Sequence, residues 1–171
     1  MVAYLEQQGR NAEALQAATE KAATIINRLK TMVSATEGFC IALTREDLMR
    51  NKFEGKKSVV LGIENGYALG KDLKNIRKFW DMGVRYLTLC HNGDNDLCDS
   101  ARKSNNEHGG LSELGRAAVE ELNRVGMLID LSHAAESTFY EVLERSKRPV
   151  ACTHSSARAL CNHPRNLTDD Q

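Results

Sequence analysis

The feature that most constrains the fold is a strict alternation of helical and strand-like segments along the 171 residues. Apolar residues recur at helical spacing in some stretches, and short, nearly continuous apolar runs of strand length lie between them. The helical patterns cover 11–33, 44–55, 69–83, 114–126 and 136–147, and the strand-like runs cover 39–43, 58–63, 84–90, 127–131 and 150–153. Strands that alternate with helices are joined by right-handed crossovers and pair in parallel. The pattern therefore predicts an α/β fold with about five parallel strands.

Two architectures contain such a set of strands. One is a doubly wound open sheet, and the other is part of an eight-stranded TIM-like (β/α)8 barrel. The spacing of Thr44 and Asp47 resembles a capping box, which predicts the start of the second helix. The segment 92–110 is polar and rich in Asn, Asp and Gly, which predicts a long loop. The order of the segments excludes neither architecture, so the choice between them depends on the residues at the strand ends.

Polar side chains follow four of the strand-like runs. Glu64 follows 58–63, His91 follows 84–90, His133 follows 127–131 and His154 follows 150–153. Alternation along a strand places Glu64, His133 and His154 on the same face as the residues two and four positions before them. In a parallel barrel these faces point inward and meet at the C-terminal rim, where the loops build active sites.

Each of these residues also has an ordinary structural interpretation. A lone histidine at a strand end is more often a hydrogen-bonded surface residue, and a lone glutamate after a strand is usually solvated. Four such residues at equivalent positions instead favour a metal site. One carboxylate and two imidazoles leave a coordination position open, which is typical of catalytic rather than structural zinc. The sequence therefore predicts that Glu64, His133 and His154 are metal ligands.

The remaining residues with metal-binding side chains give weaker signals. His108 lies in the Asn-rich loop and His163 lies beside Pro164, so both are predicted to be surface residues. The run Asp94–Asp96 does not fit a calcium-binding loop, because the residues that follow lack the required spacing of acceptors and glycine. The five cysteines show no C-x-x-C spacing, which favours reduced thiols, most of them buried, over a zinc ribbon or a redox motif.

Composition excludes several classes of protein. Lysine and arginine together number 23, as do aspartate and glutamate, and no basic block indicates nucleic acid or an acidic membrane surface. No apolar run is close to the length that a membrane span requires, which is about 18 residues. The first twenty residues lack the apolar core of a signal peptide. The compartment stays open between the cytoplasm and the periplasm.

Several motifs resemble those of the membrane (renal) dipeptidase family, zinc-dependent peptidases with a (β/α)8 barrel. The similarity runs from about residue 13 to the C-terminus. The motifs that carry it are Glu64-Asn65-Gly66, the segment 83–92 (GVRYLTLCHN), Asp130-Leu131-Ser132-His133, Thr153-His154-Ser155-Ser156, and Arg165-Asn166. The resemblance implies a hydrolase that cleaves dipeptides, including those with a C-terminal D-residue, by means of two zinc ions.

The resemblance also implies a role for each site residue. Glu64 would bridge the two metals, and His133 and His154 would hold the second one. His91 would polarise the substrate carbonyl or stabilise the oxyanion, and Arg165 would bind the substrate carboxylate through its planar guanidinium. A water activated by the metals would be the nucleophile.

The sequence also departs from the family pattern. The His-x-Asp pair that holds the first metal in the family has no counterpart upstream of Glu64, and the late-strand aspartate has none downstream. We therefore expect residues 1–171 to form one domain that is a fragment of a larger barrel, catalytically incomplete by itself and binding at most one zinc ion. The alternatives are a non-catalytic remnant that binds one metal and a different barrel metallohydrolase. We expect no nucleic-acid partner, a small dipeptide substrate, and self-association through exposed barrel edges.

Overall fold

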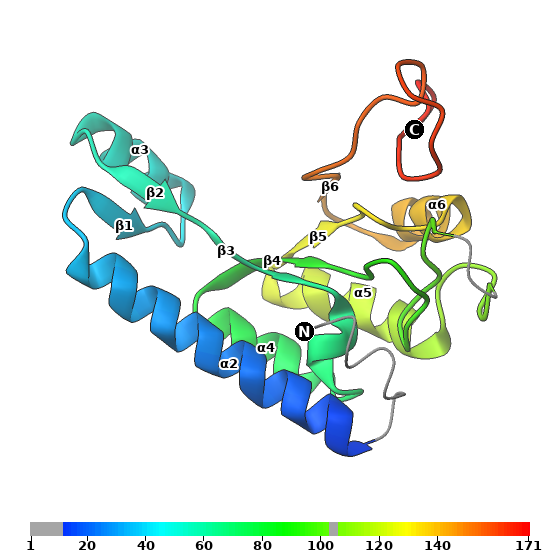
Figure 1. Cartoon of the computed structure of the whole chain (residues 1–171), viewed down its shortest axis with the longest axis horizontal. Coiled ribbons are helices and arrows are strands. Elements are labelled where there is room, and N and C mark those ends of the chain that lie inside the picture. Colours follow the sequence, from blue (N-terminus) through cyan, green and yellow to red (C-terminus); the bar gives the residue numbers. More distant parts are fainter. Residues whose placement is uncertain (1–11, 103–105) are drawn as a thin grey trace.

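The computed structural model describes residues 12–102 and 106–171 and shows strands and helices in alternation (Figure 1). This confirms the predicted α/β class. All pairings between the named strands are parallel. The helices are α2 (Ala12–Ala35), α3 (Arg45–Phe53), η1 (Gly66–Leu69, a 3-10 helix), α4 (Lys74–Asp81), α5 (Glu113–Val125) and α6 (Glu136–Arg145), and the strands are β1 (Phe39–Ile41), β2 (Lys57–Val59), β3 (Leu61–Glu64), β4 (Val84–Thr88), β5 (Leu128–Asp130) and β6 (Val150–Ala151).

The prediction of a single strand over 58–63 is wrong. The run is divided at Val60 into β2, which pairs with β1, and β3, which pairs with β4 (Figure 1). The register between β3 and β4 shifts between Leu61 and Gly62. A Cβ atom at Gly62 would overlap the ring of Tyr86, so glycine lets this ring lie over β3. One apolar run thus contributes a strand to each of two sheets, because its two halves pair with different strands.

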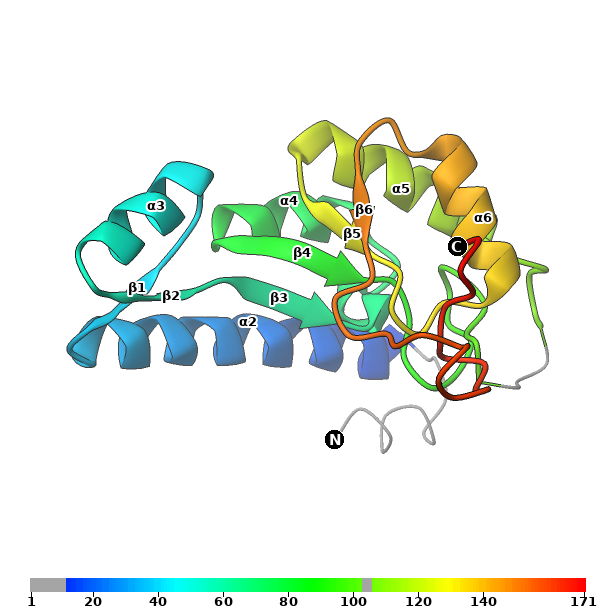
Figure 2. The ribbon, with the colours of Figure 1, turned by 90° about the horizontal axis from the view of Figure 1, so that it is seen from above.

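The main sheet has four strands in the order β3-β4-β5-β6 (Figure 2). Apolar side chains of α2, α4, α5 and α6 pack against these strands in a single core cluster that includes Ile26, Phe79, Leu122 and Val142. The opposite face is more open, since Gly62 is exposed and Leu128 keeps 37% of its surface accessible. Helices on one face and an open opposite face are what an arc of a β/α barrel presents.

Local sequence signals predicted some helix ends correctly and others incorrectly. Thr44 and Asp47 form the predicted capping box at the start of α3, with both reciprocal hydrogen bonds present. The helix predicted from Leu69 begins only at Lys74, because residues 66–69 form η1 and Gly70 follows with a left-handed φ of 62°. An apolar repeat cannot distinguish a continuous helix from a 3-10 turn followed by a new helix.

The long loop between β4 and α5 is present, as predicted, but its described residues are well packed. The buried carboxylate of Asp99 accepts hydrogen bonds from the backbone N–H groups of His108 and Gly110. The Nε2 atom of His108 lies 2.8 Å from the carbonyl oxygen of Asn95. The prediction that His108 is a surface residue is therefore wrong, whereas His163 is exposed as predicted.

All five cysteines are free thiols, as predicted. The prediction that most of them are buried is wrong: Cys90 and Cys98 are buried, Cys40 and Cys152 are half-buried, and Cys161 is exposed. Within the described residues, none of the helices has both the length and the apolar character needed to cross a bilayer.

Candidate metal centre

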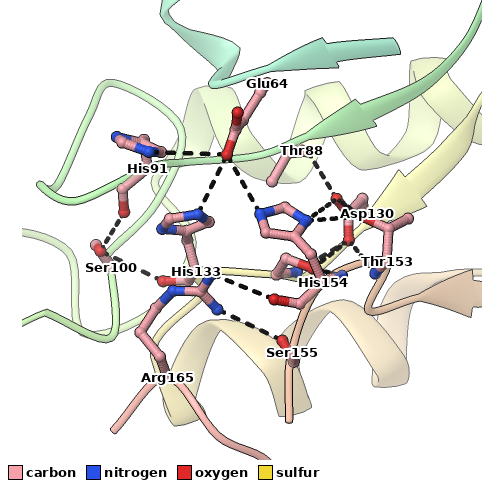
Figure 3. Close-up of polar contacts among 11 residues, drawn as sticks. Glu64, Thr88, His91, Ser100, Asp130, His133, Thr153, His154, Ser155 and Arg165 are labelled. Carbon is pink, nitrogen blue, oxygen red and sulfur yellow. Dashed lines mark hydrogen bonds and ion pairs between the residues drawn. The ribbon is translucent and has the colours of Figure 1, made fainter. Parts of the chain in front are cut away.

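The four polar residues at the strand ends meet at one point (Figure 3). The Oε1 atom of Glu64 lies 3.2 Å from Nε2 of His133, 3.2 Å from Nε2 of His154 and 3.7 Å from Nε2 of His91. The ring of His133 lies between the other two, with ring centroids 4.4 Å from His91 and 5.1 Å from His154. One carboxylate oxygen is thus the common neighbour of three imidazoles.

The turns after the strands, more than the pleat of the strands, place these side chains. Glu64 is the last residue of β3, as alternation requires. His133 instead lies three residues beyond the end of β5 and has a left-handed φ of 75°, which is uncommon for a residue other than glycine. Its carbonyl oxygen accepts hydrogen bonds from Ala101 N and Ser100 Oγ of the long loop. The tertiary contact with this loop therefore holds the turn that aims His133 at Glu64.

His133 is the most buried of the three histidines, with 7% of its side chain exposed. Burial, together with the positive charge of Arg165, lowers the pKa of His133 to about 4. The imidazole is therefore neutral at pH 7, which is the form that binds metals. Its Nδ1 atom is buried, and none of the described residues forms a hydrogen bond with it.

This donor set fits a metal ion. Ligand atoms of Glu64, His91 and His133 all lie within 4.8 Å of one another. His154 approaches the same Glu64 oxygen, so the group offers one carboxylate and three imidazoles. Imidazole and carboxylate donors are the usual ligands of zinc and of related transition metals in hydrolases. His91, which the resemblance assigns to the substrate, lies as well placed for a metal as the predicted ligands do.

Asp130 is a site residue that the sequence motifs did not predict, although its carboxylate supports the centre. Asp130 is fully buried, and its Oδ2 accepts hydrogen bonds from the hydroxyls of Thr88 and Thr153, each at 2.7 Å. Its Oδ1 accepts from Ser132 N, Ser132 Oγ and Thr153 N. Burial raises the pKa of this carboxyl, but the hydrogen bonds from Thr153, Thr88 and Ser132 outweigh that effect and hold the pKa below its usual value. The sequence feature that could have identified Asp130 is its charge, because a charged residue inside an apolar strand-like run is unusual.

Arg165 comes from the segment after β6 and reaches the edge of the site (Figure 3). Its Nη1 lies 3.5 Å from Ser155 Oγ and its Nη2 lies 3.4 Å from the carbonyl oxygen of His154. These contacts are long for hydrogen bonds, so they hold the guanidinium only weakly. The structure thus brings together all five residues singled out from the sequence.

A carboxylate and several histidines at the C-terminal ends of parallel strands, with helices on the outer face of the sheet, define part of a β/α barrel with a candidate metal centre. The model of the family described as membrane dipeptidase, peptidase family M19, matches residues 1–171. The chain belongs to this family.

Similar proteins agree with this assignment. An uncharacterized dipeptidase of Schizosaccharomyces pombe is 41% identical over 124 residues, which cover 72% of this chain and 29% of that protein. Dipeptidase 3 of Rattus norvegicus is 34% identical, with 98% of this chain and 34% of that protein covered. The chain therefore spans about a third of the length of these relatives.

Solved structures show where the fold belongs. The crystal structure of the probable dipeptidase PvdM from Pseudomonas aeruginosa matches with a TM-score of 0.81 and 37% identity, over 85% of this chain and 38% of that one. A metallo peptidase from Rhodobacter sphaeroides, liganded with a phosphinate mimic of the dipeptide L-Ala-D-Ala, matches with a TM-score of 0.76 and 30% identity, over 84% of this chain and 42% of that one. These matches confirm the predicted fold, a part of a larger TIM-like barrel.

Proposed function

We propose that this chain belongs to a zinc-dependent dipeptidase and supplies the ligands of one of its metal ions. The observation that carries the proposal is the convergence of three Nε2 atoms on Glu64 Oε1. Glu64, His133 and His154 would hold the ion. A bound zinc ion polarises a carbonyl group and lowers the pKa of water, which is the chemistry that hydrolysis of an amide bond requires.

Two further residues are proposed to contact the substrate. His91 is 30% exposed and lies beside Glu64, so its imidazole is placed to donate a hydrogen bond to a carbonyl oxygen or to the oxyanion that forms from it. Arg165 is proposed to bind the terminal carboxylate of a dipeptide, since a guanidinium can donate two parallel hydrogen bonds to a carboxylate. The D-Ala-containing mimic bound to the Rhodobacter sphaeroides enzyme supports a dipeptide with a C-terminal D-residue as substrate.

The alternative function is that of a non-catalytic metal-binding remnant. It is favoured by the absence, within these 171 residues, of the His-x-Asp pair and the late-strand aspartate that the family resemblance calls for. Loss of a general acid or base typically lowers a rate by about 10²–10⁴-fold. The four converging side chains favour dipeptidase activity, rather than metal binding alone, as the function of the whole protein.

Assay of the chain by itself tests these proposals. We expect it to bind at most one zinc ion per chain and to show no measurable hydrolysis of a glycyl-D-amino acid. Zinc content is measured by atomic absorption after dialysis, and hydrolysis by ninhydrin detection of the released amino acids. Binding of two zinc ions, or turnover that disappears in Glu64→Ala, would show that the missing ligands are dispensable or come from a second copy.

We also propose that the chain self-associates. Among the described residues, the outer strands β3 and β6 each have one side without a partner strand, and the side chains of Val60 (43%) and Leu128 (37%) are exposed. Unpaired strand edges beside apolar surface favour association.

In sedimentation velocity we expect oligomers, and we expect Leu128→Lys to raise the monomer fraction by placing a charge on the open face. The matched control is Leu160→Lys, because Leu160 is 87% exposed and lies in the segment that follows β6. A monodisperse monomer with a single cooperative melting transition would contradict the proposal.

A further inference from the structure

We propose that Thr153 is a positioning residue that fixes the tautomer of His154, with the proton on Nδ1 and the lone pair of Nε2 available to a metal. The inference rests on the proposed function, since it concerns how a metal ligand is oriented. Thr153 Oγ1 lies 2.8 Å from Nδ1 of His154 and 2.7 Å from Oδ2 of Asp130 (Figure 3). The hydroxyl thus connects the imidazole to a buried carboxylate.

The proton count decides the direction of these two hydrogen bonds. A threonine hydroxyl has one proton to donate and can also accept. Asp130 is surrounded by donors: the N–H groups of Ser132 and Thr153 and the hydroxyls of Ser132, Thr88 and Thr153. A carboxylate in this position only accepts, so the Thr153 proton points toward Asp130. The oxygen lone pair of Thr153 then faces His154, and only a protonated Nδ1 makes a hydrogen bond with it.

One other contact bears on the tautomer: Nε2 of His154 lies 3.2 Å from Oε1 of Glu64, an acceptor that favours a proton on Nε2 until a metal ion takes its place. Nδ1 of His154 lies 3.7 Å from Oδ2 of Asp130, which is too long for a direct hydrogen bond. The His154 side chain is 41% exposed, and water by itself solvates either tautomer. The hydrogen bond made by one ring nitrogen generally decides which nitrogen is free to bind a metal. Thr153 therefore supplies the orientation that solvent does not.

The backbone of His154 is connected to the same carboxylate. Ser132 Oγ accepts a hydrogen bond from His154 N at 3.0 Å and donates to Oδ1 of Asp130 at 2.8 Å. Ring and backbone are thus both held relative to Asp130, the last residue of β5. This arrangement fixes both the position of the imidazole and the direction of its Nε2.

The chain offers a matched pair of variants for a test. Thr88 and Thr153 each donate to Oδ2 of Asp130 at 2.7 Å, but only Thr153 contacts His154. Thr153→Val and Thr88→Val each remove one hydroxyl from Asp130, and Thr153→Ser keeps the hydroxyl. Isothermal titration with zinc alone is expected to show about 10–100-fold weaker binding for Thr153→Val, the usual effect of losing an outer-shell partner. Thr88→Val is expected to lose much less affinity, and Thr153→Ser to restore it.

A spectroscopic readout separates this inference from the proposed function. Long-range ¹H–¹⁵N spectra of the metal-free chain carrying Glu64→Ala, which removes the carboxylate 3.2 Å from Nε2, report which nitrogen of His154 carries the proton. In this Glu64→Ala background we expect the Nδ1–H tautomer with Thr153 in place, with Thr88→Val and with Thr153→Ser, and a mixture with Thr153→Val.

The outcomes are distinct. An Nε2–H tautomer in the Glu64→Ala chain with Thr153 in place, or equal zinc affinities for Thr153→Val and Thr88→Val, overturns the role of Thr153. Failure of the original chain to bind zinc overturns the proposed function, while the spectra still decide on Thr153. If Thr153→Val does not fold, the tautomer in the Glu64→Ala chain, with Thr153 or with Thr153→Ser, still gives a decision.

Discussion

Replacement of Glu64 by alanine is expected to abolish zinc binding by this chain. Oε1 of Glu64 is the atom that the histidines share, at 3.2 Å from both His133 and His154. Its removal takes away a proposed metal ligand and the negative charge that would offset that of the cation. The affinity should therefore fall by more than the about 10–100-fold that loss of an outer-shell partner costs. Isothermal titration with zinc measures the change.

The control is Glu46→Ala, which removes an exposed carboxylate in the first turn of α3, outside the candidate site. Both variants lose one negative charge, so a general electrostatic effect would appear equally in both. Zinc binding that survives Glu64→Ala at the affinity of Glu46→Ala would show that the ion binds elsewhere. The metal centre proposed from the strand ends would then be wrong.

The second large effect concerns the core. Phe79 in α4 has no exposed surface and belongs to the core cluster, so Phe79→Ala is expected to lower the free energy of unfolding by about 3–5 kcal/mol. Phe53 in α3 is 93% exposed, and Phe53→Ala is expected to change the free energy of unfolding by no more than about 0.5 kcal/mol. Urea unfolding followed by circular dichroism measures both values.

The contrast between the two phenylalanines tests whether this chain folds around the core described above. Because the substitutions are chemically identical, the difference between them reports burial alone. Similar small effects for both variants would mean that the isolated chain lacks this packed core. A loss of cooperativity in Phe79→Ala alone would agree with a core that lies near the limit of stability for a domain.

The sequence by itself determined the class of the fold and which residues meet at the candidate site. Helical and strand periodicities are local properties, and they predicted the alternation from α2 to β6. The C-terminal ends of parallel strands lie at the same edge of a sheet, so Glu64, His91, His133 and His154 were expected to meet, and their side chains do meet. The capping box at Thr44 was predicted for the same reason, because both of its hydrogen bonds lie within four residues.

Tertiary structure decided the features that depend on partners distant in the sequence. The division of 58–63 into β2 and β3 follows from pairing with two different strands, which no local periodicity records. The left-handed turn at His133 is held by hydrogen bonds from the long loop. Asp130 became a supporting residue only when Thr88 and Thr153 were brought beside it, from 42 and 23 residues away. Sequence periodicity records which face of an element is apolar, whereas the hydrogen bonds that orient the ligands exist only after the strands are assembled.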